Sequence, residues 1–524
     1  MKRRTLLAAP ALLALPNVAR AQDARTLRFI PQADLTVLDP MWTTAYVTRN
    51  HAFMVYDTLF GQDSQYRPSP QMLESFTTEN DGKTWTLTLR PGLLFHDGEP
   101  VRARDCVASL QRWGKRDAFG GALMARTDEL SAKDDRTLVF RLKTPFALLP
   151  NALAKTPLYM PAIMPERIAK TDPFTQVTDM TGSGPYRFKA DERVPGARVV
   201  YERFAGYKPR EGGKTDWTSG PKVVNFDRVV WTTIPDPTTA AQALINNEQD
   251  WWDYATADLM PLLSRTRGVK VVVQEPSGQI PILRFNHLQP PFNNRRLRRA
   301  LLAAVNQDDY MRAGFGDDQA VWRTCRAMMP CGVRDVTEMG LADMPALSVE
   351  AARKAVAESG YNGERTVVLA PMDYPQLGAF GIVTADLLRR IGMNVDFQPM
   401  DWGTMIARTA NREPVEKGGW SLFHTSGSMP SMLNPALNMY VRGQGAKGWS
   451  GWYDKPEIEA LTQQWLDSPA DGSQRELFDR IQRVLFDDPP LLPLGQYGVY
   501  TVRRKDITGI LDGSASYPWN VRRI

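Results

Sequence analysis

LRPGLLFHDGEPVRARDCVASLQRW, residues 89–113, decides the fold class of this chain. Apolar residues alternate with threonines over residues 84–90, and this period of two predicts the strand that leads into the stretch. A Pro-Gly pair and a polar turn follow. Cys106, Leu110 and Trp113 then recur at helical spacing. A second alternating run at residues 137–142 indicates that this strand–turn–helix unit belongs to a small α+β layer.

Three polar side chains in the turn, His96, Asp97 and Glu99, could form a metal or acid/base cluster. A structural role fits the sequence better. Asp97 and Gly98 are a turn pair, in which the carboxylate can accept a hydrogen bond from the backbone two residues on. Glu99 precedes the helix, where an acidic side chain meets the positive end of the helix dipole. We therefore expect this turn to be part of the scaffold.

The stretch resembles the signature of the family 5 extracellular solute-binding proteins, which are the oligopeptide-, dipeptide- and nickel-binding components of bacterial ABC importers. The family pattern LRPGxxFHDGxP, followed by a helix with an Asp and a Ser-Leu pair, is matched by residues 89–110. Further collinear matches lie at residues 38–40, 56–59, 182–188, 286–310, 488–489 and 492–494. Each match is weak alone, but together they span the chain and are specific.

The resemblance implies an α/β fold, a two-lobed periplasmic binding protein (type II, cluster C-like) with an extra α+β domain in the first lobe. The sheet domain of the first lobe would comprise residues 22–65, 176–286 and 489–524. Residues 66–175 would form the extra domain and residues 287–488 the second lobe, with the chain crossing near residues 285–291 and 487–494. Alternating strand and helix patterns over residues 229–273 and 348–398 agree with two α/β units. Residues 411–455 are expected to be irregular.

The N-terminus is predicted to be a secretory signal. Lys2, Arg3 and Arg4 precede an apolar run over residues 5–15, and residues 19–21 form a small-x-small cleavage site. The arginine pair also occurs in twin-arginine signals, but many Sec signals begin in the same way, so we favour Sec export. Cleavage after Ala21 would place the mature protein in the periplasm.

Charge gives no sign of a nucleic-acid partner. The chain has 64 basic and 58 acidic side chains, and the signal accounts for four of the basic ones, which leaves 60 against 58 and a net charge of +2. No later apolar run reaches the ~20 residues that a membrane helix needs. We expect an exported monomer that binds neither nucleic acid nor a resident cofactor.

The sequence lacks the common catalytic and metal-binding motifs. It contains no GxSxG, HExxH or Walker A motif, and none of its four histidines has another at i+4. We therefore expect no enzyme activity and no metal site. Cys325 and Cys331 lie six residues apart in an exported chain, and we expect them to form a disulfide. Cys106 lies on the apolar face of its helix and is expected to be a buried thiol.

Candidate ligand contacts come from loops and strand ends of both lobes, where aromatic walls and a few polar groups enclose ligands in proteins of this kind. They are Tyr46, Trp251, Trp252, Asp253, Tyr254, Trp402, Trp420, His424, Ser426 and Asn434. In peptide-binding members, an acidic residue of a second-lobe loop captures the free α-amine. The corresponding stretch here, residues 420–440, contains no Asp or Glu, so an ammonium group would lack a charge partner there.

The main hypothesis is the periplasmic substrate-binding component of an ABC importer, which captures a peptide-like or other small polar or amphipathic organic solute by hinge closure and delivers it to the inner-membrane permease. An alternative is a protein that binds a nickel chelate, a metallophore or haem, with His424 as the metal contact. A third hypothesis is an exported hydrolase. Ligand-induced compaction, stoichiometric metal or turnover, respectively, would distinguish the three.

Overall fold

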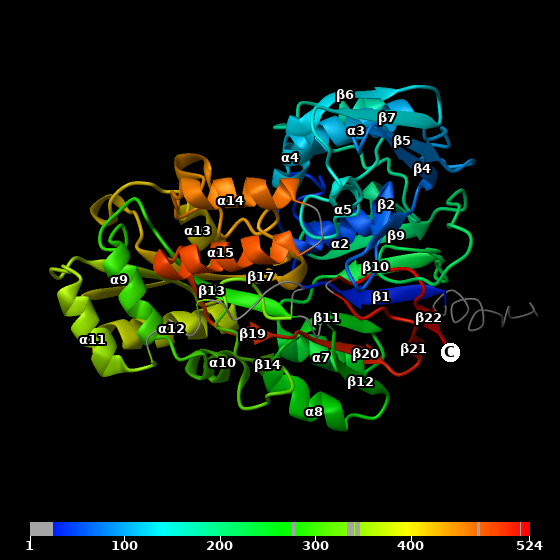
Figure 1. Cartoon of the computed structure of the whole chain (residues 1–524). Coiled ribbons are helices and arrows are strands. Elements are labelled where there is room, and N and C mark those ends of the chain that lie inside the picture. Colours follow the sequence, from blue (N-terminus) through cyan, green and yellow to red (C-terminus); the bar gives the residue numbers. More distant parts are fainter. Residues whose placement is uncertain (1–24, 275–277, 333–339, 341–345, 469–471, 514) are drawn as a thin grey trace, which may run out of the picture.

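Two large sheets and a smaller four-stranded sheet organise the computed structural model of this protein (Figure 1). The structure describes residues 25–274, 278–332, 340, 346–468, 472–513 and 515–524. The predicted signal, residues 1–21, lies outside the described residues. Both large sheets are mixed: parallel pairs form the centre of the first sheet and lie toward one edge of the second, and helices pack on them, so the predicted α/β class is confirmed.

The first sheet has seven strands within the described residues, and its parallel centre consists of β1 paired with β10 and β11. Antiparallel strands complete both edges. In spatial order the strands are β12 (Val269–Val273), β20 (Tyr500–Arg504), β11 (Trp251–Ala255), β1 (Thr26–Ile30), β10 (Arg228–Thr232), β9 (Arg198–Arg203) and β8 (Tyr186–Phe188). Helices α7 (Pro237–Ile245) and α8 (Met260–Arg265) contribute apolar side chains to a core shared with β11, β12 and β20.

The second sheet also has seven strands in the described part of the chain, and its centre is the antiparallel pair β13 and β17. In spatial order its strands are β14 (Trp322–Arg323), β19 (Gln496–Tyr497), β13 (Gln279–Phe285), β17 (Leu422–Ser428), β15 (Thr366–Pro371) and β16 (Val395–Met400), with β18 (Leu491–Pro493) also paired to β13. Helix α12 (Pro375–Arg390) packs on β15 and β16.

This pairing corrects three sequence expectations. The second sheet contains three strands whose residues were expected in the first lobe: β13, β18 and β19. All seven residues of β13 pair with β17, and β18 and β19 pair with β13. The chain therefore passes from the first sheet to the second between β12 and β13, and it returns between β19 and β20. The expected crossings were at residues 285–291 and 487–494. Strand β17 lies inside residues 411–455, which were expected to be irregular.

The four-stranded sheet contains both strands predicted around the opening stretch. Its spatial order is β4 (Leu73–Glu79), β5 (Thr84–Leu89), β7 (Thr137–Leu142) and β6 (Thr127–Ala132). Helix α3 (Ala103–Gly114) buries Cys106, Leu110 and Trp113, as their spacing predicted, and packs with α4 (Ala118–Arg126) and α6 (Glu166–Ala169). The α+β layer is therefore formed by these residues (Figure 1).

His96 connects this unit to the loop that precedes β8. Its Nδ1 accepts a hydrogen bond from the backbone N–H of Gly182 (3.2 Å), so the proton lies on Nε2, which donates to the carbonyl of Gly184 (3.0 Å). Burial lowers the pKa of His96 to about 4, so the ring stays neutral. A Cβ at Gly182 would meet the Val55 carbonyl oxygen at 2.0 Å, which shows how closely this loop packs on the end of α2 (Tyr46–Val55).

The other residues of the opening turn are also structural. Asp97 accepts a hydrogen bond from the Glu99 backbone (3.1 Å) and forms an ion pair with Arg167 (2.9 Å). Arg112 on α3 donates to the buried carboxylate of Asp39 (2.8 Å), which lies in the loop before α2. The predicted scaffold role is confirmed: the signature residues hold α2 in place, and α2 carries Tyr46 and Arg49 to the junction of the two large sheets.

The remaining elements complete the layers around the sheets. Two short sheets pair β2 (Phe60–Gln62) with β3 (Pro68–Pro70) and β21 (Ile507–Thr508) with β22 (Arg522–Arg523). The other helices are α5 (Leu149–Leu153), α9 (Arg295–Ala300), α10 (Gln307–Phe315), α11 (Val349–Glu358), α13 (Trp402–Arg408), α14 (Pro456–Asp467) and α15 (Ser473–Asp487). Of these, α14 and α15 pack on each other, and α14 extends toward α4 (Figure 1).

Candidate functional site

Tyr46, the first residue of α2, connects the two large sheets. Its hydroxyl accepts a hydrogen bond from the backbone N–H of Ser428 (2.7 Å) and donates to Oε1 of Gln279 (3.4 Å). Gln279 and Ser428 lie directly opposite each other at the end of the β13–β17 ladder. The first lobe therefore contacts the second at the ends of its two central strands, and we call this region the interlobe site.

Polar, uncharged side chains surround that contact. Ser426 lies two residues before Ser428 on β17, so both side chains are on the same face of the sheet. The hydroxyl of Tyr497, on β19, donates to Ser426 (3.2 Å), and Tyr374, at the start of α12, interacts with both. Trp402 packs against Tyr374, with ring centroids 5.7 Å apart. The interlobe site thus comprises Tyr46, Gln279, Tyr374, Trp402, Ser426, Ser428 and Tyr497.

Two polar atoms of the interlobe site have no hydrogen-bond partner among the described residues, Nε2 of Gln279 and Oγ of Ser428. Both side chains are buried, at 2% and 0% exposure. A buried polar group without a partner costs about 1–3 kcal/mol. Their presence at the junction indicates groups that a ligand can satisfy.

Arg49 brings positive charge to the edge of the site. It lies one turn after Tyr46 on α2, with its guanidinium carbon 4.6 Å from the centre of the Tyr46 ring. The guanidinium donates to Oδ1 of Asn50 (3.1 Å). With Asp253 and Tyr254 it lines a cavity of about 10 Å³, room for roughly one water molecule.

Asp253 is a buried carboxylate of the first lobe. It accepts hydrogen bonds from the Ser516 hydroxyl and from Nδ2 of Asn50 (3.4 Å). Burial raises the pKa of Asp253 to about 6, although Ser516 and the nearby Arg49 oppose this. Three of the predicted contacts lie in the interlobe site: Tyr46, Trp402 and Ser426. Asp253 and Tyr254 lie outside it, at the small cavity beside Arg49.

Trp251, Trp252 and Trp420 are core residues. Trp251 is 1% exposed, packs on Phe29 and donates to the Thr501 hydroxyl (2.7 Å). Trp252 packs in the core beneath α7 and α8. Trp420 is fully buried and packs against Phe423 and Trp452. All three pack against side chains of their own lobe, as core residues do.

His424 is also buried in the core of the second lobe. It lies on β17, fully buried, where Nε2 hydrogen-bonds with the Thr384 hydroxyl (2.8 Å), which in turn bonds with Tyr310. Burial lowers the pKa of His424 to about 3. The Asn434 side chain accepts hydrogen bonds from the backbone N–H groups of Ala436 (3.1 Å) and Leu437 (3.0 Å), and it thereby caps a local turn. Within the described residues no group of three His, Cys, Asp or Glu side chains is placed to hold a metal ion.

Sequence reasoning missed Gln279, Tyr374, Ser428 and Tyr497. Ser426 and Ser428 do alternate along the chain, which is the signal of a strand with a polar face. Gln279 gave no comparable signal, because it becomes part of the site only through its pairing with Ser428.

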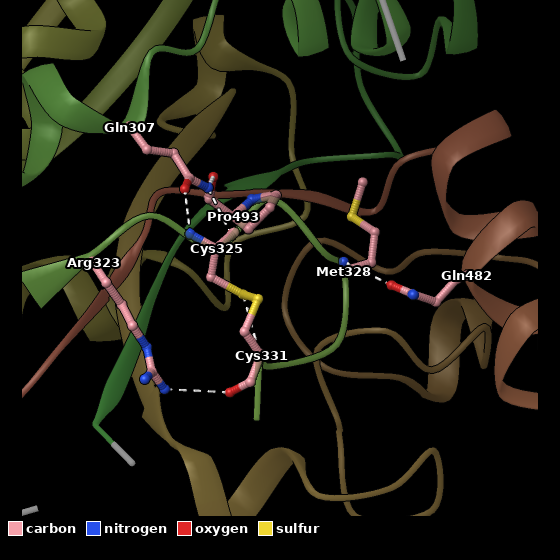
Figure 2. Close-up of a disulfide and its surroundings, with 7 residues drawn as sticks. All are labelled: Gln307, Arg323, Cys325, Met328, Cys331, Gln482 and Pro493. Atoms are coloured by element: carbon pink, nitrogen blue, oxygen red, sulfur yellow. Dashed lines mark hydrogen bonds between the residues drawn. A yellow bond between two sulfur atoms is a disulfide. The ribbon is translucent and has the colours of Figure 1, made fainter. Parts of the chain in front are cut away.

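Cys325 and Cys331 form a disulfide next to the second sheet (Figure 2). Gln307 holds the loop through its side chain, which accepts from the Cys325 backbone N–H (2.6 Å) and donates to the carbonyls of Cys325 and Pro493 (both 2.8 Å). Met328 donates its backbone N–H to Gln482 on α15 (3.1 Å). The disulfide loop thus connects α10, α15 and β18. Cys106 is a buried free thiol.

Three further contacts join the lobes around the interlobe site. Arg126 on α4 forms an ion pair with Asp467 on α14 (2.6 Å). The Tyr66 hydroxyl lies 3.0 Å from the sulfur of Met429. The Tyr500 hydroxyl donates to Asp318 (2.8 Å). The lobes are therefore in contact on several sides of the site.

Comparison with known proteins gives consistent matches. The sequence profile of the bacterial extracellular solute-binding proteins, family 5, matches residues 67–448. A probable peptide ABC transporter periplasmic-binding protein of Sinorhizobium fredii is 37% identical over 99% of this chain and 98% of that protein. The glutathione-binding protein GsiB of Pectobacterium atrosepticum is 26% identical over 97% of this chain and 96% of that protein.

Among solved structures, the binding protein AgaA of A. tumefaciens R10, in complex with agropinic acid, superposes with a TM-score of 0.80 at 20% identity, over 95% of this chain and 99% of AgaA. The fold is that of the two-lobed periplasmic binding proteins, as the resemblance implied.

Proposed function

Because the chain belongs to family 5 of the bacterial extracellular solute-binding proteins, we propose that it is the substrate-binding component of an ABC importer. It captures a peptide-like or other small polar or amphipathic organic solute between its lobes and presents it to permease subunits in the inner membrane. The observation that carries this proposal is Tyr46, whose hydroxyl reaches from the first lobe to the ends of β13 and β17. Ligand binding at this contact would couple directly to lobe closure.

The ligand would be bound rather than transformed. The family consists of binding proteins, and the interlobe site is composed of tyrosines, serines, an amide and an indole. A peptide-like ligand is supported by the name of the Sinorhizobium relative, a probable peptide-transporter component. The aromatic and hydroxyl groups of the site suit the backbone and side chains of such a ligand.

The division into lobes follows the sheets. The first lobe would comprise residues 25–65, 176–274 and 498–524, with an extra domain at residues 66–175, and the second lobe residues 278–497. The protein would act as a monomer in the periplasm after Sec export and cleavage near Ala21. No helix in the described part of the chain is long and apolar enough to cross a membrane.

The test begins with the ligand itself. Protein purified gently from its native periplasm is analysed by native mass spectrometry for co-purifying solutes. The stripped protein is then titrated with the recovered fraction, and with a broad metabolite library, while small-angle scattering reports the radius of gyration and calorimetry the melting temperature. Compaction and a rise in melting temperature are expected with at least one solute, and their absence with all of them contradicts the proposal.

Two matched variants localise the binding. Tyr46→Phe removes the hydroxyl that contacts Gln279 and Ser428 and is expected to weaken ligand-induced closure. Tyr361→Phe removes a hydroxyl that donates to the Glu364 carbonyl on the second lobe and is expected to bind like the wild type. Equal affinity of the two variants would place the ligand elsewhere.

A further inference from the structure

We infer that the interlobe site recognises a hydrogen-bond acceptor of the ligand, a carboxylate or a carbonyl, and discriminates against a free ammonium group. This inference rests on the proposed function and names the class of solute that the same site takes. It assigns Gln279 and Ser428 as the residues that determine this specificity.

The first observation is the supply of donors. Nε2 of Gln279 carries two N–H groups and Oγ of Ser428 carries one O–H, and neither atom has a partner among the residues that the structure describes. The two side chains are neighbours in register at the end of the β13–β17 ladder. On Gln279, the acceptor Oε1 already receives the Tyr46 hydroxyl. What the amide offers to a ligand is therefore its donor end.

The second observation is the charge around the site. Arg49 places a buried guanidinium against the Tyr46 ring, so the positive charge lies one aromatic ring away from the contact with Ser428. An acceptor with negative charge gains from the guanidinium and an ammonium is repelled by it, and the Asp253 carboxylate beside Arg49 weakens both effects.

Nearby carboxylates are already bound. Asp253 accepts from Ser516 and Asn50 within the first lobe. Asp373, next to Tyr374, accepts the backbone N–H of Trp402 (2.7 Å), and Asp401 accepts that of Thr404 (2.9 Å) at the start of α13. Residues 420–440 contain no acidic side chain. An acceptor would satisfy both Nε2 of Gln279 and Oγ of Ser428, whereas an ammonium could donate to the Ser428 hydroxyl but would leave the Gln279 N–H groups unpaired.

The size of the preference follows from those two donors. A site built to hydrogen-bond a group rejects an analogue that leaves its buried polar atoms unpaired, and one such bond to a charged acceptor corresponds to about tenfold or more in affinity. We therefore expect acceptor-terminated ligands to bind at least about tenfold more tightly than amine-terminated ones of the same side-chain composition.

Three pools of dipeptides with all side-chain combinations test this on the full-length mature protein. One pool is N-acetylated with a free carboxylate, the second is N-acetylated and C-amidated, and the third is C-amidated with a free amine. Equilibrium dialysis with mass-spectrometric readout measures the bound fraction of each pool. Enrichment of either acetylated pool over the free-amine pool by about tenfold is expected. Equal or stronger binding of the free-amine pool, or binding of no pool, overturns the inference.

A variant that introduces a negative charge isolates Gln279. Gln279→Glu keeps the side-chain shape and the acceptor for Tyr46 but replaces the donor end by a carboxylate. It is expected to reduce binding of the acetylated pools and to shift the preference toward the free-amine pool. Gln242→Glu introduces the same charge on the exposed face of α7 and should leave the preference unchanged. An unchanged preference in Gln279→Glu overturns the assignment of this residue.

The dialysis also separates this inference from the proposed function. Suppose that a recovered native solute binds and compacts the protein, but that the free-amine pool is preferred in dialysis. The importer role then stands, and only the inferred preference for acceptor groups is refuted. If neither the pools nor any native solute binds, both fail.

Discussion

The ion pair between Arg126 and Asp467 should act as a latch on the closed form. It connects α4, next to the four-stranded sheet, with α14 of the second lobe at 2.6 Å. Arg126 is preorganised, because it also donates to the Ala122 carbonyl (3.1 Å) and lies over the ring of Phe146. Replacing Asp467 by Asn removes the charge while preserving shape.

The expected magnitude is modest. The Arg126 side chain is 8% exposed but that of Asp467 is 49% exposed, so water screens the pair and its contribution is about 0.5–1 kcal/mol. This corresponds to a two- to fivefold shift of the unliganded equilibrium toward the open form. Ligand affinity should fall by up to the same factor, because only the closed fraction is fully competent.

Small-angle scattering of the ligand-free protein at low and high salt measures the shift. Asp467→Asn should increase the radius of gyration at low salt, and the difference from the wild type should shrink at high salt. Glu129→Gln removes an ion pair with Arg141 within the four-stranded sheet and serves as the matched control. If both variants have the wild-type radius of gyration and affinity at low salt, the latch does not exist and closure is determined elsewhere.

Three further predictions concern stability. Asp39→Ala leaves the buried guanidinium of Arg112 without its carboxylate and should reduce the free energy of unfolding in urea by about 3–5 kcal/mol. Burial, with Arg193 adding to it, lowers the pKa of His51 from 6.5 to about 3, so below pH 6.5 the unfolded chain binds a proton that the folded chain excludes. Stability should therefore fall as the pH decreases, by about 2–3 kcal/mol from this group at pH 4.5, and His51→Gln should flatten the slope of unfolding free energy against pH. Replacing Cys325 and Cys331 by Ser opens a loop with a sequence separation of 6 and should cost about 2 kcal/mol in calorimetry, whereas an unchanged melting temperature would indicate that the Gln307 contacts suffice.

Sequence patterns were reliable where a structure depends on near neighbours along the chain. The alternation before residue 90 and the spacing of Cys106, Leu110 and Trp113 became β5 and the buried face of α3. Tyr46 and Ser426 were predicted as contacts because they were expected in loops, and the structure places them at the start of α2 and on β17.

The aromatic and histidine residues were less predictable. Tryptophan and histidine are common in binding sites, which is why Trp251, Trp420 and His424 were predicted as contacts. An indole or an imidazole is equally suited to the core of a protein. Which of the two applies depends on what packs against it: Thr384 from α12 encloses His424, and Trp452 encloses Trp420.

By itself, the sequence determined the strand–turn–helix of residues 89–113, the α/β class and, through collinear motifs, the family. Only the tertiary structure decided that β13 leaves the first lobe to pair with β17, and that Tyr46 contacts Ser428 across 382 positions of sequence. The physical reason is that side-chain periodicity reports which face of an element is buried, whereas strand pairing and lobe contact depend on which partner is brought to that face. The donors of Gln279 and Ser428 lie side by side only because β13 pairs with β17.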